Sequence, residues 1–241
     1  MRRWLDWWRS RREGPPIPEP LWQGTWQARP FLAQHAPDLQ SQERLRALAS
    51  GFLAHKEFTG AGGLVITDAM ALDIAVQAVL PLLHLAPRDR PRDALAWYDD
   101  FVAVVVHPDM VLARRSVTDE QGVVHEYEEE LAGEAMEQGP VMLSWRDVAA
   151  DTANPPEGAG PLNVVIHEFA HKLDMRDGRV DACPPLPAGF LGQVSAAGAR
   201  RAWFDRLTPA FEAHREQVIR AFILSSAKVT RYRVRQPLID H

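Results

Sequence analysis

The chain has 241 residues, of which 46% are apolar, enough for a sizeable core in one large domain or two small ones. Its 27 basic and 32 acidic residues give a formal net charge of −5, which excludes the overall basic character of a protein that binds nucleic acid directly. A single cysteine, Cys183, excludes an internal disulfide, and no apolar run approaches the length of a transmembrane helix.

Residues 1–20 are predicted to form an N-terminal tail. Tryptophans and arginines interleave over residues 1–12, with no continuous apolar stretch and no small-residue cleavage site, so the segment lacks the pattern of a secretory signal. Contact with a membrane surface or an acidic partner is the alternative to a poorly ordered tail. Residues 14–20 are rich in proline and are expected to be extended. With the single cysteine, these features predict a cytoplasmic protein.

Two helices are predicted in the first third of the chain. The first spans residues 38–56, where apolar side chains recur at helical spacing, and the glycines at 60–63 end it. Residues 64–66 (LVI) predict a short strand. Thr67 is the expected cap of a second helix, from Asp68 to about Leu85, whose apolar residues lie nearly all round it and indicate burial. Pro81 is expected to kink or break that helix.

Strands are predicted over residues 101–106, 123–130 and 140–145, and later helices over 196–207 and 209–222, with Thr208 as a cap and Pro209 at the first helical position. The mixture predicts an α+β fold, rich in helices, with a small sheet beside the helix described next. Residues 141–145 are a candidate for a sheet edge that pairs with an extended substrate. A plain core strand is the alternative for the same residues.

The segment 167–171 reads HEFAH and carries the strongest chemical signal in the chain. On a helix, His167 and His171 lie one turn apart on the same face, so both imidazoles can bind one zinc ion. Glu168 lies about 100° around the helix from His167, where its carboxylate can take a proton from water beside the metal without binding the metal itself. This arrangement is typical of a zinc metallopeptidase that hydrolyses peptides.

The surroundings of the motif decide between this interpretation and a chance match with two ordinary histidines. Apolar residues precede and follow the motif at helical spacing, residues 154–161 form a loop before it, and Asp177 and Gly178 end the helix. These features favour a metal site. Asp174 lies one further turn along the same face, where it is either a carboxylate that orients a histidine or a surface residue at the helix end.

Four stretches resemble the Mlc titration factor family of cytoplasmic zinc-dependent peptidases, the glucose-regulated metallopeptidases. They are residues 58–64 (FTGAGGL), 131–135 (LAGEA), 139–145 (GPVMLSW) and 163–175 (NVVIHEFAHKLDM). The resemblance covers about residues 20–216. It implies a zincin-like fold similar to the metalloprotease domain of anthrax lethal factor, one zinc ion on His167 and His171, and Glu168 as the base. In enterobacterial members it also implies binding to Mlc, a repressor of sugar-uptake genes.

The chain departs from the family pattern after Glu216. The resemblance implies a third zinc ligand, a glutamate downstream of the motif, in a segment with a tyrosine-bearing turn, and this sequence has no glutamate beyond Glu216. A frameshifted or truncated reading frame would produce such a tail. Glu212 and Glu216 are candidate replacements, or else part of a solvated helix face, and Tyr232 is a candidate for the tyrosine. Weaker candidate ligands are Asp181, Asp205, His214, Asp240 and His241.

The sequence therefore supports two hypotheses. The first is a zinc peptidase domain over residues 21–216 followed by an atypical tail over 217–241, with activity that the loss of the third ligand would impair. The second is a non-catalytic regulator that binds a Mlc-like repressor through its surface. The substrate, the choice between exo- and endopeptidase action and the oligomeric state have no signature in the sequence.

Overall fold

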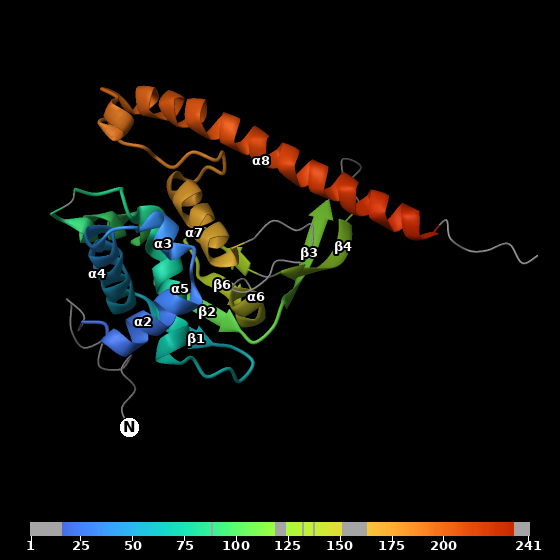
Figure 1. Cartoon of the computed structure of the whole chain (residues 1–241), viewed down its shortest axis with the longest axis horizontal. Helices are drawn as coiled ribbons and strands as arrows, with labels where there is room; N and C mark the ends of the chain where they lie inside the picture. Colours follow the sequence, from blue (N-terminus) through green and yellow to red (C-terminus); the bar gives the residue numbers. More distant parts are fainter. Residues whose placement is uncertain are drawn as a thin grey trace, which may run out of the picture. The chain divides into compact units, whose positions relative to one another are not determined.

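A computed structural model describes residues 16–87, 89–118, 124–131, 133–136, 138–150 and 163–233. Residues 1–15 of the predicted tail over 1–20, the loop at 154–161 and the last eight residues lie outside these ranges. The chain divides into two compact units, one formed by Met1–Thr152 and Asn163–Val180, the other by Ala153–Leu162 and Asp181–His241. The first unit contains the sheet and the HEFAH segment (Figure 1).

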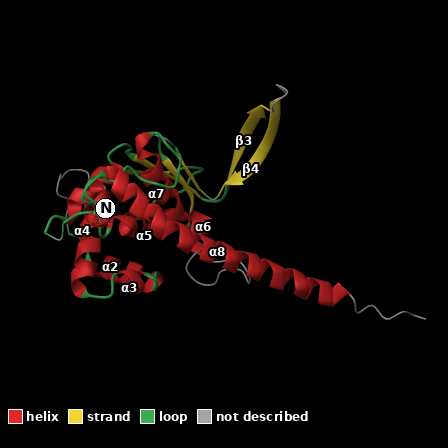
Figure 2. Ribbon diagram, turned by 90° about the horizontal axis from the view of Figure 1, so that it is seen from above, coloured by secondary structure: helices red, strands yellow, loops and turns green. Residues whose placement is uncertain are grey.

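The first unit is helix-rich with a small sheet, in agreement with the predicted α+β class (Figure 2). Its α-helices are α2 (Glu19–Ala28), α3 (Leu32–His35), α4 (Leu39–His55), α5 (Asp68–Val79), α6 (Trp145–Ala150) and α7 (Val164–Asp174). Its 3-10 helices are η1 (Leu80–Leu82), η2 (Pro91–Tyr98) and η3 (Met175–Asp177). Its strands are β1 (Glu57–Gly60), β2 (Ala103–His107), β3 (Val111–Thr118), β4 (Val124–Leu131), β5 (Gly133–Ala135) and β6 (Val141–Ser144).

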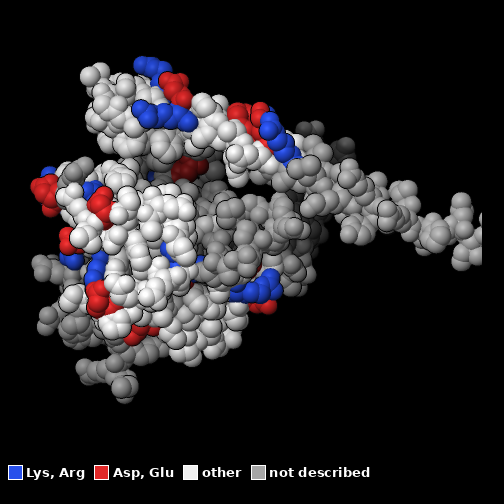
Figure 3. Space-filling view, in the orientation of Figure 1, with Lys and Arg blue, Asp and Glu red and all other residues white. Residues whose placement is uncertain are grey.

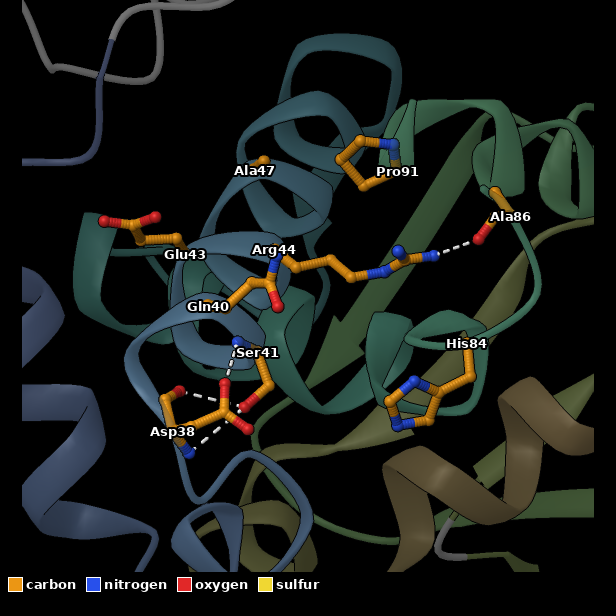
Figure 4. A pocket seen from close by; sticks show the side chains of 9 residues that line it. All are labelled: Asp38, Gln40, Ser41, Glu43, Arg44, Ala47, His84, Ala86 and Pro91. Carbon is orange, nitrogen blue, oxygen red and sulfur yellow. Dashed lines mark hydrogen bonds between the residues drawn. The ribbon is translucent and has the colours of Figure 1, made fainter. Parts of the chain in front are cut away.

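Helix α4 confirms the prediction for residues 38–56 almost to the residue. Asp38 accepts a hydrogen bond from the Ser41 backbone at 2.7 Å, and the Asp38 backbone donates to the Ser41 hydroxyl at 3.3 Å (Figure 4). This capping box supplies partners for backbone groups that the first helical turn leaves open. Lys56 ends the helix with an extended backbone. Pro18, at the N-cap position of α2, has φ −57° and ψ 135°, an extended backbone as predicted for the proline-rich stretch. Pro20 differs from the prediction, because it lies in the first turn of α2, where its missing N–H costs nothing.

Helix α5 is capped by Thr67, as predicted, and all residues from Met70 to Val79 are buried. It ends earlier than the predicted Leu85, because the chain passes into the 3-10 helix η1 around Pro81. The predicted strand over 64–66 is wrong. Gly62 and Gly63 have φ angles of +58° and +80°, which turn the chain there, and β1 lies before them instead of after them.

The sheet has the strand order β1-β2-β6-β5, with β1, β2 and β6 parallel and β5 antiparallel to β6. Strands β2 and β6 confirm the predictions for residues 101–106 and 140–145. The candidate edge over 141–145 is wrong, because β6 pairs with β2 on one side and with β5 on the other. Helix α7 packs beside β5 and β6, so the sheet does lie next to the HEFAH helix. Strands β3 and β4 form a separate antiparallel ribbon (Figure 2).

The buried face of α7 rests on an aromatic cluster. The Phe169 ring lies 5.3 Å from Tyr98, 5.5 Å from Phe52 and 5.9 Å from Phe101, all with steeply inclined planes. Such edge-to-face pairs contribute about 0.5–1.5 kcal/mol each beyond the burial of their area. The Tyr98 hydroxyl donates to the carbonyl oxygen of Ala78 at 3.0 Å and lies 3.4 Å from that of Phe169. This cluster fixes the helix on the core by the side that faces away from its histidines.

The second unit contains η4 (Phe190–Gly192) and the long helix α8 (Ala196–Arg233). The predicted break at Pro209 is wrong, since α8 continues through it. Pro209 removes only the hydrogen bond to residue 205, and Asp205 lies on an exposed part of the helix where interior packing is not disturbed. Acidic and basic side chains alternate along α8 in Figure 3, and Arg215–Glu212 and Arg220–Glu216 are ion pairs one turn apart. In the described part of the chain, no helix is both long and apolar enough to cross a membrane.

Candidate metal centre

Helix α7 begins at a residue that is held from two sides. Asn163 is its N-cap, and the Asn163 Oδ1 atom accepts a hydrogen bond from the Ile166 backbone at 2.8 Å. The Nδ2 atom of the same side chain donates to Oε1 of Gln77, on α5, at 2.7 Å. Asn163 therefore supplies an acceptor for a backbone N–H of the first helical turn and also attaches the helix to the core.

The attachment continues into a buried polar network. Gln77 is fully buried and donates to Oδ1 of Asp73 at 3.1 Å, and Asp73 in turn accepts from Nε of Arg29 at 2.6 Å. Arg29 is 1% exposed and also donates to the carbonyl oxygen of Val148 at 2.8 Å. Because buried polar groups are costly without partners, this chain of hydrogen bonds strongly favours one position for the start of α7.

His167 and His171 face each other on the outer side of α7. Their Nε2 atoms lie 3.2 Å apart, and their rings are perpendicular within 2°, with an interplanar angle of 88° and centroids 4.6 Å apart. At this distance one nitrogen can donate to the other, depending on the tautomers. Burial, and secondarily His171, lowers the pKa of His167, which favours the neutral ring that a metal requires.

The separation of the two nitrogens fits a single metal ion. Zinc binds histidine nitrogen at about 2.0–2.1 Å with tetrahedral angles, so two ligands on one ion lie about 3.3 Å apart. The observed 3.2 Å agrees with that value. The donor chemistry agrees as well, because neutral imidazole is a favoured zinc ligand. The two histidines that the sequence analysis selected are thus brought together in an arrangement that can hold a metal.

Glu168 lies against strand β5. It is 6% exposed, and its carboxylate accepts a hydrogen bond from the backbone of Ala135. A Cβ atom placed on Gly133 would lie 2.7 Å from the Glu168 Cγ and 2.8 Å from its Oε1. The carboxyl group therefore lies against the backbone of β5 at a distance that only glycine permits. Burial raises the pKa of Glu168 to about 7; the Ala135 hydrogen bond lowers it and the charge of Glu134 raises it further.

The contact between Gly133 and Glu168 was not predicted from the sequence. A signal was present, because a glycine within a short strand often marks a close approach of another group to the backbone. The group that approaches could not be named from the sequence, since Glu168 lies 35 residues further along the chain.

A second buried charge holds α7 on the side of η2. Lys172 is fully buried and donates to the carbonyl oxygen of Met136 at 2.9 Å, and its Nζ lies 3.0 Å from Oδ2 of Asp100. Arg176 pairs with Asp99 at 2.7 Å just beyond the end of α7. Gly178 then ends η3 with a left-handed backbone, at φ +78°, as the predicted helix end required.

The remaining candidates differ in outcome. Asp174 is 9% exposed, so the alternative of a surface residue is wrong, while its role in orienting a histidine stays a prediction. Glu216 is exposed and Glu212 partly exposed, and both pair with arginines of α8, as expected for a solvated helix face. Asp181 pairs with Arg200 at 3.0 Å. Among the described residues, no group of three His, Cys, Asp or Glu side chains is arranged to hold a metal. The side chain of Tyr232 and residues 240 and 241 lie outside the description.

Comparison with known proteins places the sequence in a family. The sequence matches the family described as glucose-regulated metallo-peptidase M90 over residues 4–233. The chain belongs to this metallopeptidase family. The family relationship extends through both units and confirms the resemblance drawn from the four sequence stretches.

Individual relatives are similar at a moderate level. An uncharacterized protein of Synechocystis sp. is 35% identical over 185 residues, which is 76% of this chain and 62% of that protein. Proteins named Mlc titration factor A, from Yersinia pestis and Yersinia pseudotuberculosis, are 34% identical over 146 residues, 60% of this chain and 49% of theirs. The chain thus spans 49% to 62% of the length of these relatives.

Proposed function

We propose that the protein is a zincin-like, zinc-dependent peptidase in which His167 and His171 hold the zinc ion and Glu168 is the general base. The observation that carries the proposal is the 3.2 Å separation of the two Nε2 atoms, which suits two ligands of one ion. Membership of a metallopeptidase family supports the same reading.

In the proposed peptide hydrolysis, the zinc ion would activate water and Glu168 would transfer the proton. When bound, zinc lowers the pKa of water toward 7 and polarises the scissile carbonyl. Glu168 accepts the proton of the attacking water and delivers it to the leaving amine. The contact with Gly133 and the hydrogen bond from Ala135 hold the Glu168 carboxyl in one place on α7, which is what a group that must receive and return a proton requires.

The substrate is a peptide in extended conformation, which we place along β5. This strand pairs with β6 on one side, and its other side pairs with no strand in the described ranges. Because Glu168 lies against the β5 backbone, a peptide that pairs with the open side would pass beside the catalytic carboxyl. Strand β5 replaces residues 141–145 as the candidate edge.

A catalytic zinc site takes three protein ligands and one open position. Glu212 and Glu216 are the candidate third ligands, although their pairing with Arg215 and Arg220 supports a solvated face of α8. Elemental analysis of the purified full chain tests this step. About one zinc ion per chain indicates a complete ligand set. Substoichiometric zinc that is lost on dialysis indicates a remnant of two ligands.

The decisive experiment replaces Glu168 by glutamine. We expect Glu168→Gln to retain zinc and to lose cleavage of fluorogenic peptides, because the amide cannot accept the proton. Glu57→Gln, an exposed carboxylate on the opposite edge strand β1, is the matched control and should cleave at the wild-type rate. Cleavage by Glu168→Gln at the wild-type rate would overturn the assignment of the base.

A repressor-binding regulator is the alternative. It is favoured by the name Mlc titration factor A of the Yersinia relatives, of which this chain spans 49%. The same substitution separates the two functions, since a regulator that binds through its surface keeps its affinity for a Mlc-like repressor in Glu168→Gln. Retained repressor binding by a chain that neither holds zinc nor cleaves peptides would favour the regulator.

A further inference from the structure

Lys172, next in sequence to His171 on α7, is a fully buried lysine. Its ammonium nitrogen lies 2.9 Å from the carbonyl oxygen of Met136, 3.4 Å from that of Gly139 and 3.0 Å from Oδ2 of Asp100. An ammonium has three N–H donors, so each of these oxygens can accept one of them. Because a lysine is almost never fully buried without partners, these contacts decide where the side chain lies.

Two of the three oxygens belong to the turn that joins β5 to β6. Met136 directly follows β5, and Gly139 lies two residues before β6. The Gly139 N–H donates to the Met136 carbonyl oxygen at 3.1 Å, and the Met136 N–H donates to that of Pro140 at 3.3 Å. Gln138 has a φ angle of +50°, which is uncommon for a residue other than glycine. Lys172 therefore gives this turn a charged donor and binds it to α7.

Helix α7 contacts the same hairpin at a second point (Figure 1). Glu168 precedes Lys172 by four residues, so the two side chains lie on one face of the helix, one turn apart. The Glu168 carboxylate accepts from the Ala135 backbone and lies against Gly133, while Lys172 binds the carbonyl oxygen of Met136, the residue after Ala135. One turn of α7 thus holds two adjacent residues at the end of β5.

Strand β5 depends on these contacts for its position. It has only three residues, and within the described ranges it pairs with β6 alone. So short a ladder gives little stability of its own, because few backbone hydrogen bonds and few buried side chains hold it. The contacts from α7 therefore decide how far the β5 backbone lies from the Glu168 carboxyl.

We propose that Lys172 is a positioning residue for peptide hydrolysis. It holds the turn between β5 and β6 on α7, and it thereby sets the distance between the β5 edge, where we place the substrate, and the Glu168 carboxyl. Lys172 contacts neither substrate nor metal in this role, because its donors are directed at Met136, Gly139 and Asp100. The inference rests on the proposed function and adds to it a residue outside the HEFAH segment.

Lys172→Met tests the proposal, since it removes the ammonium and keeps an unbranched side chain. Asp100→Asn is the matched control, because it removes the charge on the other side of the same ammonium and leaves both carbonyl oxygens of the turn within reach of Lys172. We expect both variants to melt at a lower temperature than the wild type, since each leaves a buried charge without its partner.

The kinetic measurement uses a fluorogenic peptide and the full chain loaded with zinc, at a temperature where all variants are folded. We expect kcat/KM to fall at least about tenfold in Lys172→Met, because a misplacement of about 1 Å near the reacting groups costs up to about 10²-fold. Asp100→Asn should stay within about twofold of the wild type, since its lysine still binds the turn.

Amide hydrogen exchange supplies a readout that does not depend on catalysis. The Ala135 N–H donates to the Glu168 carboxylate, so its exchange reports the separation of β5 from α7. We expect this amide to exchange at least about tenfold faster in Lys172→Met than in the wild type, and no more than about threefold faster in Asp100→Asn. Should Lys172→Met not fold, the double variant with Asp100→Asn takes its place, because it removes both charges of the pair together.

A wild-type chain that cleaves no peptide would overturn the proposed function and, with it, the role of Lys172 in hydrolysis. With an active wild type, three results count against Lys172 alone. They are wild-type kcat/KM in Lys172→Met, losses of equal size in Lys172→Met and Asp100→Asn, and unchanged exchange of the Ala135 amide in Lys172→Met. Losses of equal size would mean that Lys172 only stabilises the fold.

Discussion

Gly133→Ala should reduce peptide cleavage strongly while leaving the fold intact. The new methyl group would lie 2.7 Å from Cγ, 2.8 Å from Oε1 and 3.0 Å from Cδ of Glu168. Non-bonded carbon atoms prefer about 3.5–4.0 Å, so the carboxyl end of Glu168 must move by about 1 Å. A misplacement of that size at a reacting group costs about 10²-fold in rate, equivalent to about 2.7 kcal/mol in activation free energy.

Stability should respond in the opposite sense. Gly133 has no positive φ, so alanine is compatible with its backbone, and the three atoms nearest to the new methyl group all belong to the flexible side chain of Glu168. Replacing glycine by alanine at a compatible position stabilises a protein by about 0.4–1 kcal/mol through the unfolded chain. The melting temperature should therefore stay the same or rise slightly while kcat falls.

Two other glycines calibrate the measurement. Gly24→Ala places its methyl group in open space on α2 and should leave both kcat and stability close to wild type or better. Gly60→Ala places it 1.9 Å from the carbonyl oxygen of Leu64, a backbone atom that cannot move aside, and should destabilise the chain. Melting curves and cleavage of a fluorogenic peptide are recorded for all three. Wild-type kcat in a folded Gly133→Ala variant would refute the claim that this contact positions the base.

Three further predictions concern the support of α7 and the core. Asn163→Ala should lower the free energy of unfolding by about 1–2 kcal/mol in urea titrations, because it removes the cap and leaves Gln77 without its donor. Arg29→Ala should cost about 3–5 kcal/mol in the same assay, because it leaves the Asp73 carboxylate buried without its charge partner. Lys56 has a folded pKa of about 8, below its ordinary 10.5, so the unfolded chain binds more protons between these values. The unfolding free energy should therefore rise from about pH 8 to pH 10.5, and Lys56→Met should flatten that rise in pH-dependent denaturation.

Local chemistry explains which elements could be predicted from the sequence. The limits of α4 and the start of α5 follow from side chains that cap their own backbone, Asp38 and Thr67, and such signals need no knowledge of the fold. The apolar strand β2 was predictable for the same reason, since its β-branched run fits a buried position between two strands.

The strand predictions that were wrong concern segments whose structure is determined by tertiary contacts. Residues 57–60 (EFTG) have little strand character, but they form strand β1 because they pair with β2. Residues 64–66 are more apolar, yet they form a loop in which only Ile66 is buried. Residues 141–145 look like an edge or a core strand equally well. Only the pairing with β5 shows that β6 is interior.

In the candidate site, too, features that depend on local sequence could be predicted, and features that depend on tertiary contacts could not. The spacing of His167 and His171 fixes their separation through the geometry of one helix, so the sequence was sufficient to predict that the two rings meet. The place of Glu168 against Gly133, and the tether from Asn163 to Gln77, depend on segments that meet only in the folded chain.

The same distinction explains why a third metal ligand is the hardest element to predict. Two ligands on adjacent turns of a helix are local, whereas a third must arrive from another element, and its identity is a property of the tertiary structure. The fold fixes the helix that carries the first two ligands. Helix α7 is held by Asn163 at its start, by Phe169 on its buried face and by Lys172 near its end. A helix held at three points presents its histidine pair with little freedom, so the zinc affinity of the full chain should depend mainly on what the third ligand supplies. Comparing the zinc affinity of Glu212→Gln and Glu216→Gln with that of wild type measures that contribution directly: a loss in one variant assigns the ligand, and no loss in either excludes both.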